Sequence, residues 1–224
     1  MKVQKISDHI WSLKKWVIIP IHVWVVVDED GVTLVDAGLP MMAKGITEFI
    51  KELDAGPLKR IVITHGHPDH VGAVNLILKD TNVPVFAHQI EIPYMEGEIP
   101  YPGRKKAKQA VTKQLIQSLQ EDEHGKLNSV GGLTPYLTPG HSPGHVAYYH
   151  EQDQVLLAGD LFTSRKGKIR KPHALFTTDM KEAVRSGSIL EELKPKMLAV
   201  CHGDPVLDPA NQLEEYVQKM EKKL

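Results

Sequence analysis

The 224-residue sequence is poor in several features that would place a protein in a specialised class. It has one cysteine, Cys201, so no internal disulfide can form, and a reducing compartment is expected. Its beginning, MKVQKISDHIW, lacks the apolar segment of a signal peptide. The longest apolar run, WVIIPIHVWVVV, falls well short of the roughly 20 apolar residues that a membrane span needs. These absences predict a soluble cytoplasmic protein with no membrane partner.

The sequence also lacks an excess of charge of either sign. It has 27 Lys and Arg residues against 28 Asp and Glu residues, so nothing indicates a polyanionic partner attracted by bulk charge. A small-molecule substrate is expected, and nucleic acid is not. Apolar residues make up 42% of the chain, and the length suits one domain over residues 1–224. The sequence does not decide the oligomeric state, and a dimer remains open.

Strand-like and helix-like segments alternate along most of the chain, which indicates an α/β fold. Strands are expected where short β-branched or apolar runs end at turn residues: at 22–28, 31–36, 58–64, 83–88, 146–150, 155–160 and 197–202. Helices are expected from apolar residues at helical spacing at 41–54, 71–79 and 179–193, and after Pro209.

The segment from Gly103 to about Glu123 has a different composition. It is rich in strong helix formers, and its apolar residues recur every three to four positions. We therefore predict a surface helix within a helical insertion at about 93–130. Its Lys and Arg residues are expected to form a solvated face.

The motif HGHPDH places His65, His67, Asp69 and His70 within six residues. Imidazole and carboxylate groups are the usual protein ligands of divalent metals such as zinc. In a tight turn, alternate residues project to one side, so His65 and His67 can bind one ion while Asp69 and His70 reach a second. A purely structural turn is disfavoured, because burying unpaired polar side chains costs on the order of a few kcal/mol each. A mononuclear site, with Asp69 as a general base, is the alternative.

Four of the polar residues share a position relative to the strands. Asp36, His65, Asp160 and His202 each stand where an apolar strand ends and a glycine-containing loop begins. Strand ends along one edge of a sheet commonly present functional residues. We therefore expect one shared site, to which His141, Asp160 and His202 supply further ligands.

These motifs resemble the signature of the metallo-β-lactamase superfamily. The match runs in order through HGHPDH, TPGHSPGH, LLAGD and VCHGD, and covers about residues 23–204. The resemblance implies a four-layer αβ/βα sandwich, in which two mixed β-sheets are flanked by helices and the site lies at one edge.

The resemblance also implies a binuclear metal centre. The first metal would bind His65, His67 and His141, the second would bind Asp69, His70 and His202, and Asp160 would bridge both. Asp36 would lie behind the ligands and hold one of the histidines by a hydrogen bond, and His145 would lie near the site, either behind the ligands or in a structural role. Two divalent ions are implied, zinc first and iron or manganese as alternatives. Cys201 is expected to point into the core and away from the metals.

The implied reaction is hydrolysis by a metal-bridging hydroxide, with Asp69 orienting it and passing on a proton. Enzymes acting on β-lactams lack an aspartate at the position of Asp160, so that activity is disfavoured. The segment GDLF resembles hydroxyacylglutathione hydrolases (glyoxalase II), which favours an ester or thioester substrate. Those enzymes commonly append a helical glutathione-binding domain, whereas a single helix is expected here after His202.

Three alternatives remain for the function. A lactonase of the acyl-homoserine lactone type would typically have a tyrosine where this sequence has Thr163. A phosphodiesterase or nuclease and a non-enzymatic metal-dependent sensor are the other two. Within the basic segment SRKGKIRKP, the side chains of Arg165, Lys166 and Lys168 are candidate ligands of a substrate carboxylate or phosphate. A solvated loop is the alternative for this segment.

Overall fold

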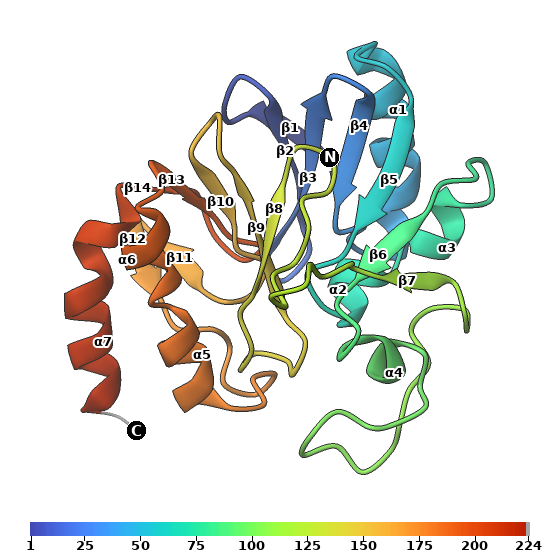
Figure 1. Ribbon diagram of the computed structural model, residues 1–224. Coiled ribbons are helices and arrows are strands. Elements are labelled where there is room, and N and C mark those ends of the chain that lie inside the picture. Colours follow the sequence, from blue (N-terminus) through green and yellow to red (C-terminus); the bar gives the residue numbers. More distant parts are fainter. Residues whose placement is uncertain (223–224) are drawn as a thin grey trace.

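The computed structural model describes residues 1–222, and its main feature is a pair of β-sheets packed face to face (Figure 1). The first sheet contains seven strands in sequence order: β1 (Lys2–Lys5), β2 (Ile10–Trp16), β3 (Pro20–Asp28), β4 (Gly31–Val35), β5 (Leu58–Val62), β6 (Val85–Ala87) and β7 (Ile116–Ser118). Strands β1 to β4 pair antiparallel, and β4 to β7 pair parallel. The sheet is therefore mixed, as predicted.

The second sheet contains five strands in the order β14-β13-β10-β9-β8. They are β8 (Thr134–Leu137), β9 (Val146–His150), β10 (Val155–Leu157), β13 (Met197–Ala199) and β14 (Val206–Leu207). Only β10 and β13 pair parallel within it, so this sheet is mixed as well. A separate hairpin is formed by β11 (Thr163–Arg165) and β12 (Lys168–Arg170).

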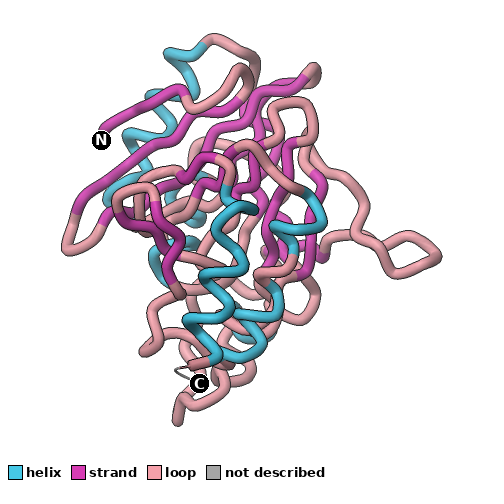
Figure 2. Tube along the Cα trace, turned by 90° about the vertical axis from the view of Figure 1, so that its left-hand side faces the viewer, coloured by secondary structure: helices cyan, strands magenta, loops and turns pink. Residues whose placement is uncertain are grey.

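Helices cover the outer face of each sheet (Figure 1). The helices are α1 (Ala43–Leu53), α2 (Pro68–Val71), α3 (Val74–Ile77), α4 (Ile92–Met95), α5 (Met180–Ser186), α6 (Ile189–Leu193) and α7 (Leu213–Glu221), with the 3-10 turns η1 (Pro40–Met42) and η2 (Pro209–Gln212). Helices α1 and α3 lie on the first sheet, and α5, α6 and α7 lie on the second. Figure 2 shows the helix that leads to the C-terminus on the outside of the molecule, with strands behind it. The order is helix, sheet, sheet, helix, and the predicted four-layer sandwich is confirmed.

The second sheet is buried on both faces, by the first sheet on one side and by helices on the other. In β9, Val146 and Tyr148 join the core between the sheets, whereas Ala147 and Tyr149 join the core beneath α5 to α7. Successive side chains of a strand point to opposite faces. A strand covered on both sides therefore has a continuous apolar sequence, and all five residues of β9 are buried.

Most of the predicted elements are present. The strands at 22–28 and 31–36 correspond to β3 and β4. Their antiparallel pairing ends at Asp28 and Gly31, which flank a two-residue turn. The helix expected at 179–193 is divided into α5 and α6. Of the helix expected at 71–79, only the short α3 at Val74–Ile77 is formed, and α2 precedes it at Pro68–Val71. Among the described residues, no helix has both the length and the apolar character that crossing a bilayer requires.

The helix predicted from Gly103 to about Glu123 is wrong, and so is the helical character of the insertion at 93–130. Within that range the described structure has only α4, followed by a loop and the strand β7. Gln114 adopts a left-handed conformation with φ of 60°, which no helix interior allows, and its N–H donates to the buried Glu96 carboxylate at 2.6 Å. Ile116 then pairs with Val85 of β6. Strand pairing at the sheet edge has overridden local helix propensity.

Candidate metal centre

The site lies at the edge of the two sheets where several strands end. Asp36 follows β4, His65 follows β5, Asp160 follows β10 and His202 follows β13. The pairs β4–β5 and β10–β13 are parallel, so within each pair the carboxyl ends share an edge. His141 joins them from the loop between β8 and β9. The predicted convergence of strand ends is therefore present.

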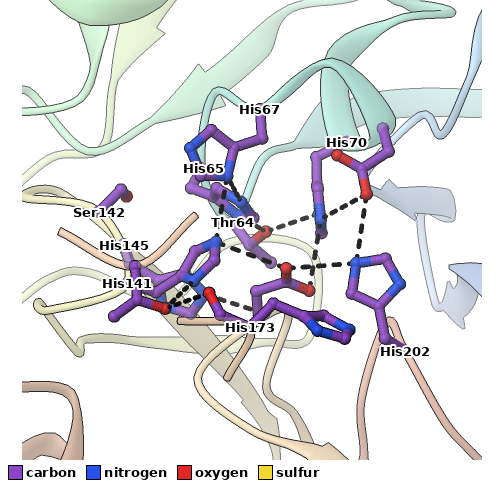
Figure 3. Close-up of polar contacts among 12 residues, drawn as sticks. Thr64, His65, His67, His70, His141, Ser142, His145, His173 and His202 are labelled. Atoms are coloured by element: carbon purple, nitrogen blue, oxygen red, sulfur yellow. Dashed lines mark hydrogen bonds and ion pairs between the residues drawn. The ribbon is translucent and has the colours of Figure 1, made fainter. Parts of the chain in front are cut away.

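Three histidines form one half of the site, which we call the histidine cluster: His65, His67 and His141 (Figure 3). The His67 Nδ1 atom lies 2.9 Å from His65 Nε2 and 3.0 Å from His141 Nε2. The outer nitrogens are held from behind, since His65 Nδ1 contacts the Thr64 hydroxyl at 3.1 Å and His141 Nδ1 contacts the Thr177 hydroxyl at 3.1 Å. Three ring nitrogens thus face a common point.

The other half of the site, which we call the carboxylate cluster, contains Asp69, His70, Cys201 and His202, with one ligand atom of each within 4.8 Å of the others. Asp69 Oδ2 lies 3.2 Å from His202 Nε2 and 3.9 Å from His70 Nε2. His202 Nδ1 donates to the carbonyl of Pro20 at 2.8 Å, which directs the opposite nitrogen, Nε2, into the site.

Asp160 lies between the two clusters. One of its oxygens, Oδ2, is 3.4 Å from His141 Nε2 and 3.2 Å from His202 Nε2. The other oxygen, Oδ1, is 3.5 Å from His70 Nε2. Among the described residues, Asp160 Oδ1 and His70 Nε2 are buried side-chain atoms without a hydrogen-bond partner. Buried polar atoms are normally paired, and a carboxylate and an imidazole nitrogen are ligands that divalent metals accept, so the donor set fits a metal.

Asp36 orients His70 from behind, as the sequence predicted. Its Oδ2 accepts a hydrogen bond from His70 Nδ1 at 2.7 Å, and its Oδ1 accepts from the backbone N–H of Thr64 at 2.8 Å. Asp36 is fully buried and has a positive φ of 58°, which costs a non-glycine residue about 1 kcal/mol. The hydrogen bond keeps a proton on Nδ1 of His70, so the opposite nitrogen, Nε2, faces the site.

His145 supports Asp160 through the backbone. Its Nε2 accepts the N–H of Asp160 at 3.2 Å, and its Nδ1 pairs with the Thr138 hydroxyl at 2.9 Å. The ring is fully buried, and burial lowers its pKa well below the ordinary value, so it is neutral at pH 7. A neutral ring that donates to Thr138 and accepts from Asp160 fixes the start of the Asp160 loop.

Glu91 is a functional-site residue that the sequence analysis missed. Its fully buried carboxylate accepts four hydrogen bonds: from Gly66 N–H at 3.0 Å, the Tyr101 hydroxyl at 2.6 Å, the Ser142 hydroxyl at 2.9 Å and Gly144 N–H at 2.8 Å. Gly66 lies between two residues of the histidine cluster, His65 and His67, and Ser142 follows the third, His141. One buried carboxylate therefore ties the two loops of the histidine cluster together. The only signal in the sequence is an acidic residue within the apolar stretch HQIEIPYM.

The position of Cys201 differs from the prediction. It is fully buried and belongs to the core between the sheets, as expected. Its sulfur nevertheless lies within 4.8 Å of ligand atoms of Asp69, His70 and His202. The strand β13 ends at Ala199, and the chain bends from 201 to 203. Neighbouring side chains in a bend need not point to opposite sides.

The two clusters differ in charge. Burial lowers the pKa of His67 to about 3 and that of His141 to about 4, so the rings of the histidine cluster are neutral at pH 7. In the carboxylate cluster, burial opposes ionisation of Asp69, but the charge of His70 outweighs it and lowers the Asp69 pKa to about 2. Burial also disfavours a charged His70, and the nearby Cys201, Asp36 and other acids raise its pKa above the ordinary value.

Two further groups of residues lie outside these clusters. Tyr101 and Phe176 flank His67, with ring centroids 5.2 Å and 6.5 Å from it, and the Phe176 side chain is half exposed. The predicted substrate-binding residues Arg165, Lys166 and Lys168 are exposed on the β11–β12 hairpin. No hydrogen bond or ion pair among residues 1–222 joins them to the two clusters, so their role stays a prediction.

Comparisons with known proteins agree with this architecture. The family described as the Metallo-beta-lactamase superfamily matches residues 16–202. The "probable metallo-hydrolase YybB" of Bacillus subtilis is 37% identical over 221 residues, which cover 97% of this chain and 98% of that protein. The hydroxyacylglutathione hydrolase GloC of Haemophilus influenzae is 28% identical over 154 residues, 67% of this chain and 71% of that protein. A metallo-beta-lactamase structure from Pontibacter korlensis superposes with a TM-score of 0.74 at 22% identity, covering 98% of both chains, which confirms the fold.

Proposed function

The chain belongs to the metallo-β-lactamase superfamily, and from that membership we propose that it is a binuclear metal-dependent hydrolase of esters or thioesters, similar to glyoxalase II. The proposal depends most on Asp160, whose Oδ2 lies 3.4 Å from a nitrogen of the histidine cluster and 3.2 Å from one of the carboxylate cluster. A carboxylate can bridge two cations and offset their charge, whereas a neutral imidazole cannot.

In this proposal each cluster would hold one divalent ion. The first ion would be held by His65, His67 and His141, the second by Asp69, His70 and His202, and Asp160 would serve both. Zinc is the metal we propose, because imidazole nitrogens dominate the donor set. Two such ions, when bound, would lower the pKa of a water molecule towards neutrality and polarise a substrate carbonyl.

Asp69 is the proposed proton-handling residue. Its side chain is 27% exposed, whereas those of His70, Asp160 and His202 are at most 7% exposed, so it borders the open side of the site. With a pKa lowered to about 2, its carboxylate is ionised at pH 7. It can therefore accept a hydrogen bond from the attacking water, orient it, and pass the proton to the leaving group.

The expectation of a carbonyl substrate has two supports. The relative from Haemophilus influenzae is named as a hydrolase of hydroxyacylglutathione, which is a thioester. The rings of Tyr101 and Phe176 beside His67 offer an apolar wall for an acyl chain. The Thr163 hydroxyl, by contrast, donates to the carbonyl of Lys171 at 2.9 Å within the β11–β12 hairpin, so it is engaged away from a lactone carbonyl.

The test combines metal content with a substrate panel. Freshly purified protein is analysed for metals and then assayed on an acyl thioester, a simple ester, a lactone, a phosphodiester and a β-lactam. We expect two divalent ions per chain and fastest turnover of the thioester or ester. Chelation should abolish turnover and lower the thermal unfolding temperature, because ions that bind only the folded state stabilise it. Fastest turnover of the phosphodiester or lactone, or full turnover after chelation, would overturn the proposal, and metal binding without any turnover would indicate a sensor.

A further inference from the structure

Cys201 is a residue whose position the proposed reaction does not explain. It is the only cysteine of the chain and is fully buried. A buried cysteine is most often a small apolar residue of the core. Here, however, its sulfur and one ligand atom each of Asp69, His70 and His202 all lie within 4.8 Å of one another. The position therefore brings a thiol into the carboxylate cluster.

The backbone fixes Cys201 on both sides. Its N–H donates to the carbonyl of Gly159 at 2.9 Å, directly before Asp160. Its carbonyl accepts from the N–H of His22 in β3 at 3.2 Å. The residue is thus held between the second sheet and the first, so the place of the sulfur is set by the two sheets and not by a mobile loop.

A second observation points to a ligand at this position. His70 Nε2 is fully buried, has no hydrogen-bond partner among the described residues, and belongs to the same group of four donors. Its other nitrogen is fixed by Asp36 at 2.7 Å, so the ring cannot turn to find a partner elsewhere. An unpaired nitrogen held in place beside a thiol, a carboxylate and a second imidazole has the chemistry of a metal ligand set.

We propose that the Cys201 thiolate is a fourth side-chain ligand of the metal bound by Asp69, His70 and His202, in addition to the shared Asp160. The inference rests on the metal centre of the proposed function. On binding, the thiol releases its proton to solvent as the sulfur–metal bond forms. A sulfur ligand makes the carboxylate cluster softer than the histidine cluster, so it should prefer zinc, cobalt or cadmium to manganese.

Cobalt substitution tests this ligand directly. Metal is removed from the full-length protein with a chelator, two equivalents of cobalt(II) are added, and the absorption spectrum is recorded during the titration. We expect a sulfur-to-cobalt charge-transfer band in the near ultraviolet that grows with one of the two equivalents. Because Cys201 is the only cysteine, the band has no other thiolate source. Cys201→Ser should bind cobalt without the band and lose one ion to a competing chelator about 10- to 100-fold more readily.

The possible outcomes distinguish a failure of the proposed role of Cys201 from a failure of the proposed metal centre. Binding of two cobalt ions by the unmodified protein without the band would overturn the role of Cys201 and leave the proposed function intact. Failure to bind cobalt would overturn both. If Cys201→Ser does not fold, the spectrum of the unmodified protein still decides, and Cys201→Ala provides a second variant whose folding is checked by circular dichroism.

Discussion

The histidine cluster and the carboxylate cluster are neighbours that are stabilised in different ways. The histidine cluster consists of neutral rings, and its loops are joined by Glu91, which contacts the backbone beside the ligands. The carboxylate cluster contains ionised Asp69, and Asp36 contacts a ligand ring itself, at 2.7 Å. One supporting carboxylate positions loops, and the other fixes the proton of a ligand.

Because of this difference, the two halves of the site should respond differently to the loss of their supporting carboxylates. Loss of a carboxylate that sets a proton position changes which ring nitrogen can bind a metal. Loss of a carboxylate that joins loops changes the stability of the loops and only indirectly the ligands. Asp160, which both clusters share, should affect each of them.

Replacing Asp160 should have the largest effect. Asp160→Ala removes the only carboxylate within residues 1–222 that contacts both clusters, at 3.4 Å and 3.2 Å. We expect loss of one metal per chain and a decrease in kcat/KM of about 10³-fold or more. Metal analysis and turnover of the preferred thioester or ester measure the two effects. Retention of two ions per chain would show that Asp160 is not the bridge.

Replacing Asp36 should affect the carboxylate cluster selectively. In Asp36→Asn the amide nitrogen faces His70 Nδ1, which then accepts a hydrogen bond, so the ring proton moves to Nε2 and blocks metal binding. We expect about 10- to 100-fold weaker binding of one metal and a comparable loss of activity. Asp153→Asn is a matched control, because Asp153 pairs with His9 Nδ1 at the same 2.7 Å outside the site. If Asp36→Asn weakened the binding of both metals equally, a selective role of Asp36 in the carboxylate cluster would be contradicted.

The convergence of the histidines and carboxylates of the two clusters could largely be predicted from the sequence, because it depends on local features. HGHPDH places four donors in one turn, and Asp36, Asp160 and His202 are marked by the apolar strands that end beside them. A strand that is buried on both faces is continuous in the sequence, so its end is visible.

The features that could not be predicted depend on contacts between distant segments. Glu91 contacts Gly144, which is 53 positions away along the chain, through loops whose course no periodicity describes. The segment around Ile116 has the composition of a helix but pairs with β6 as a strand, because the edge of the sheet offers hydrogen bonds. Cys201 lies beyond the end of β13, in a bend that brings ligand atoms of both Cys201 and His202 into the carboxylate cluster.

Replacing Glu91 should have the smallest effect of the three on activity. In Glu91→Gln one oxygen becomes an NH₂ group, which donates and cannot accept a hydrogen bond. The backbone N–H of Gly144 would then lose its acceptor, or that of Gly66 if the amide is reversed, and the neighbouring hydroxyl of Ser142 or Tyr101 would lose its acceptor as well. A buried donor left without an acceptor costs about 1–3 kcal/mol of unfolding free energy. We expect a stability loss of that size, measured by denaturant unfolding, with weaker binding of the metal in the histidine cluster.

Glu96→Gln is the matched control for this variant. Glu96 is also a buried glutamate, and it accepts from the backbone N–H of Gln114 at 2.6 Å, in a loop that contains no metal ligand. It should lose stability without a change in metal affinity. If Glu91→Gln and Glu96→Gln lower the unfolding free energy by similar amounts and neither changes the affinity for either metal, Glu91 contributes to loop packing alone. If Glu91→Gln weakens only the metal of the carboxylate cluster, the division of support between Asp36 and Glu91 is wrong.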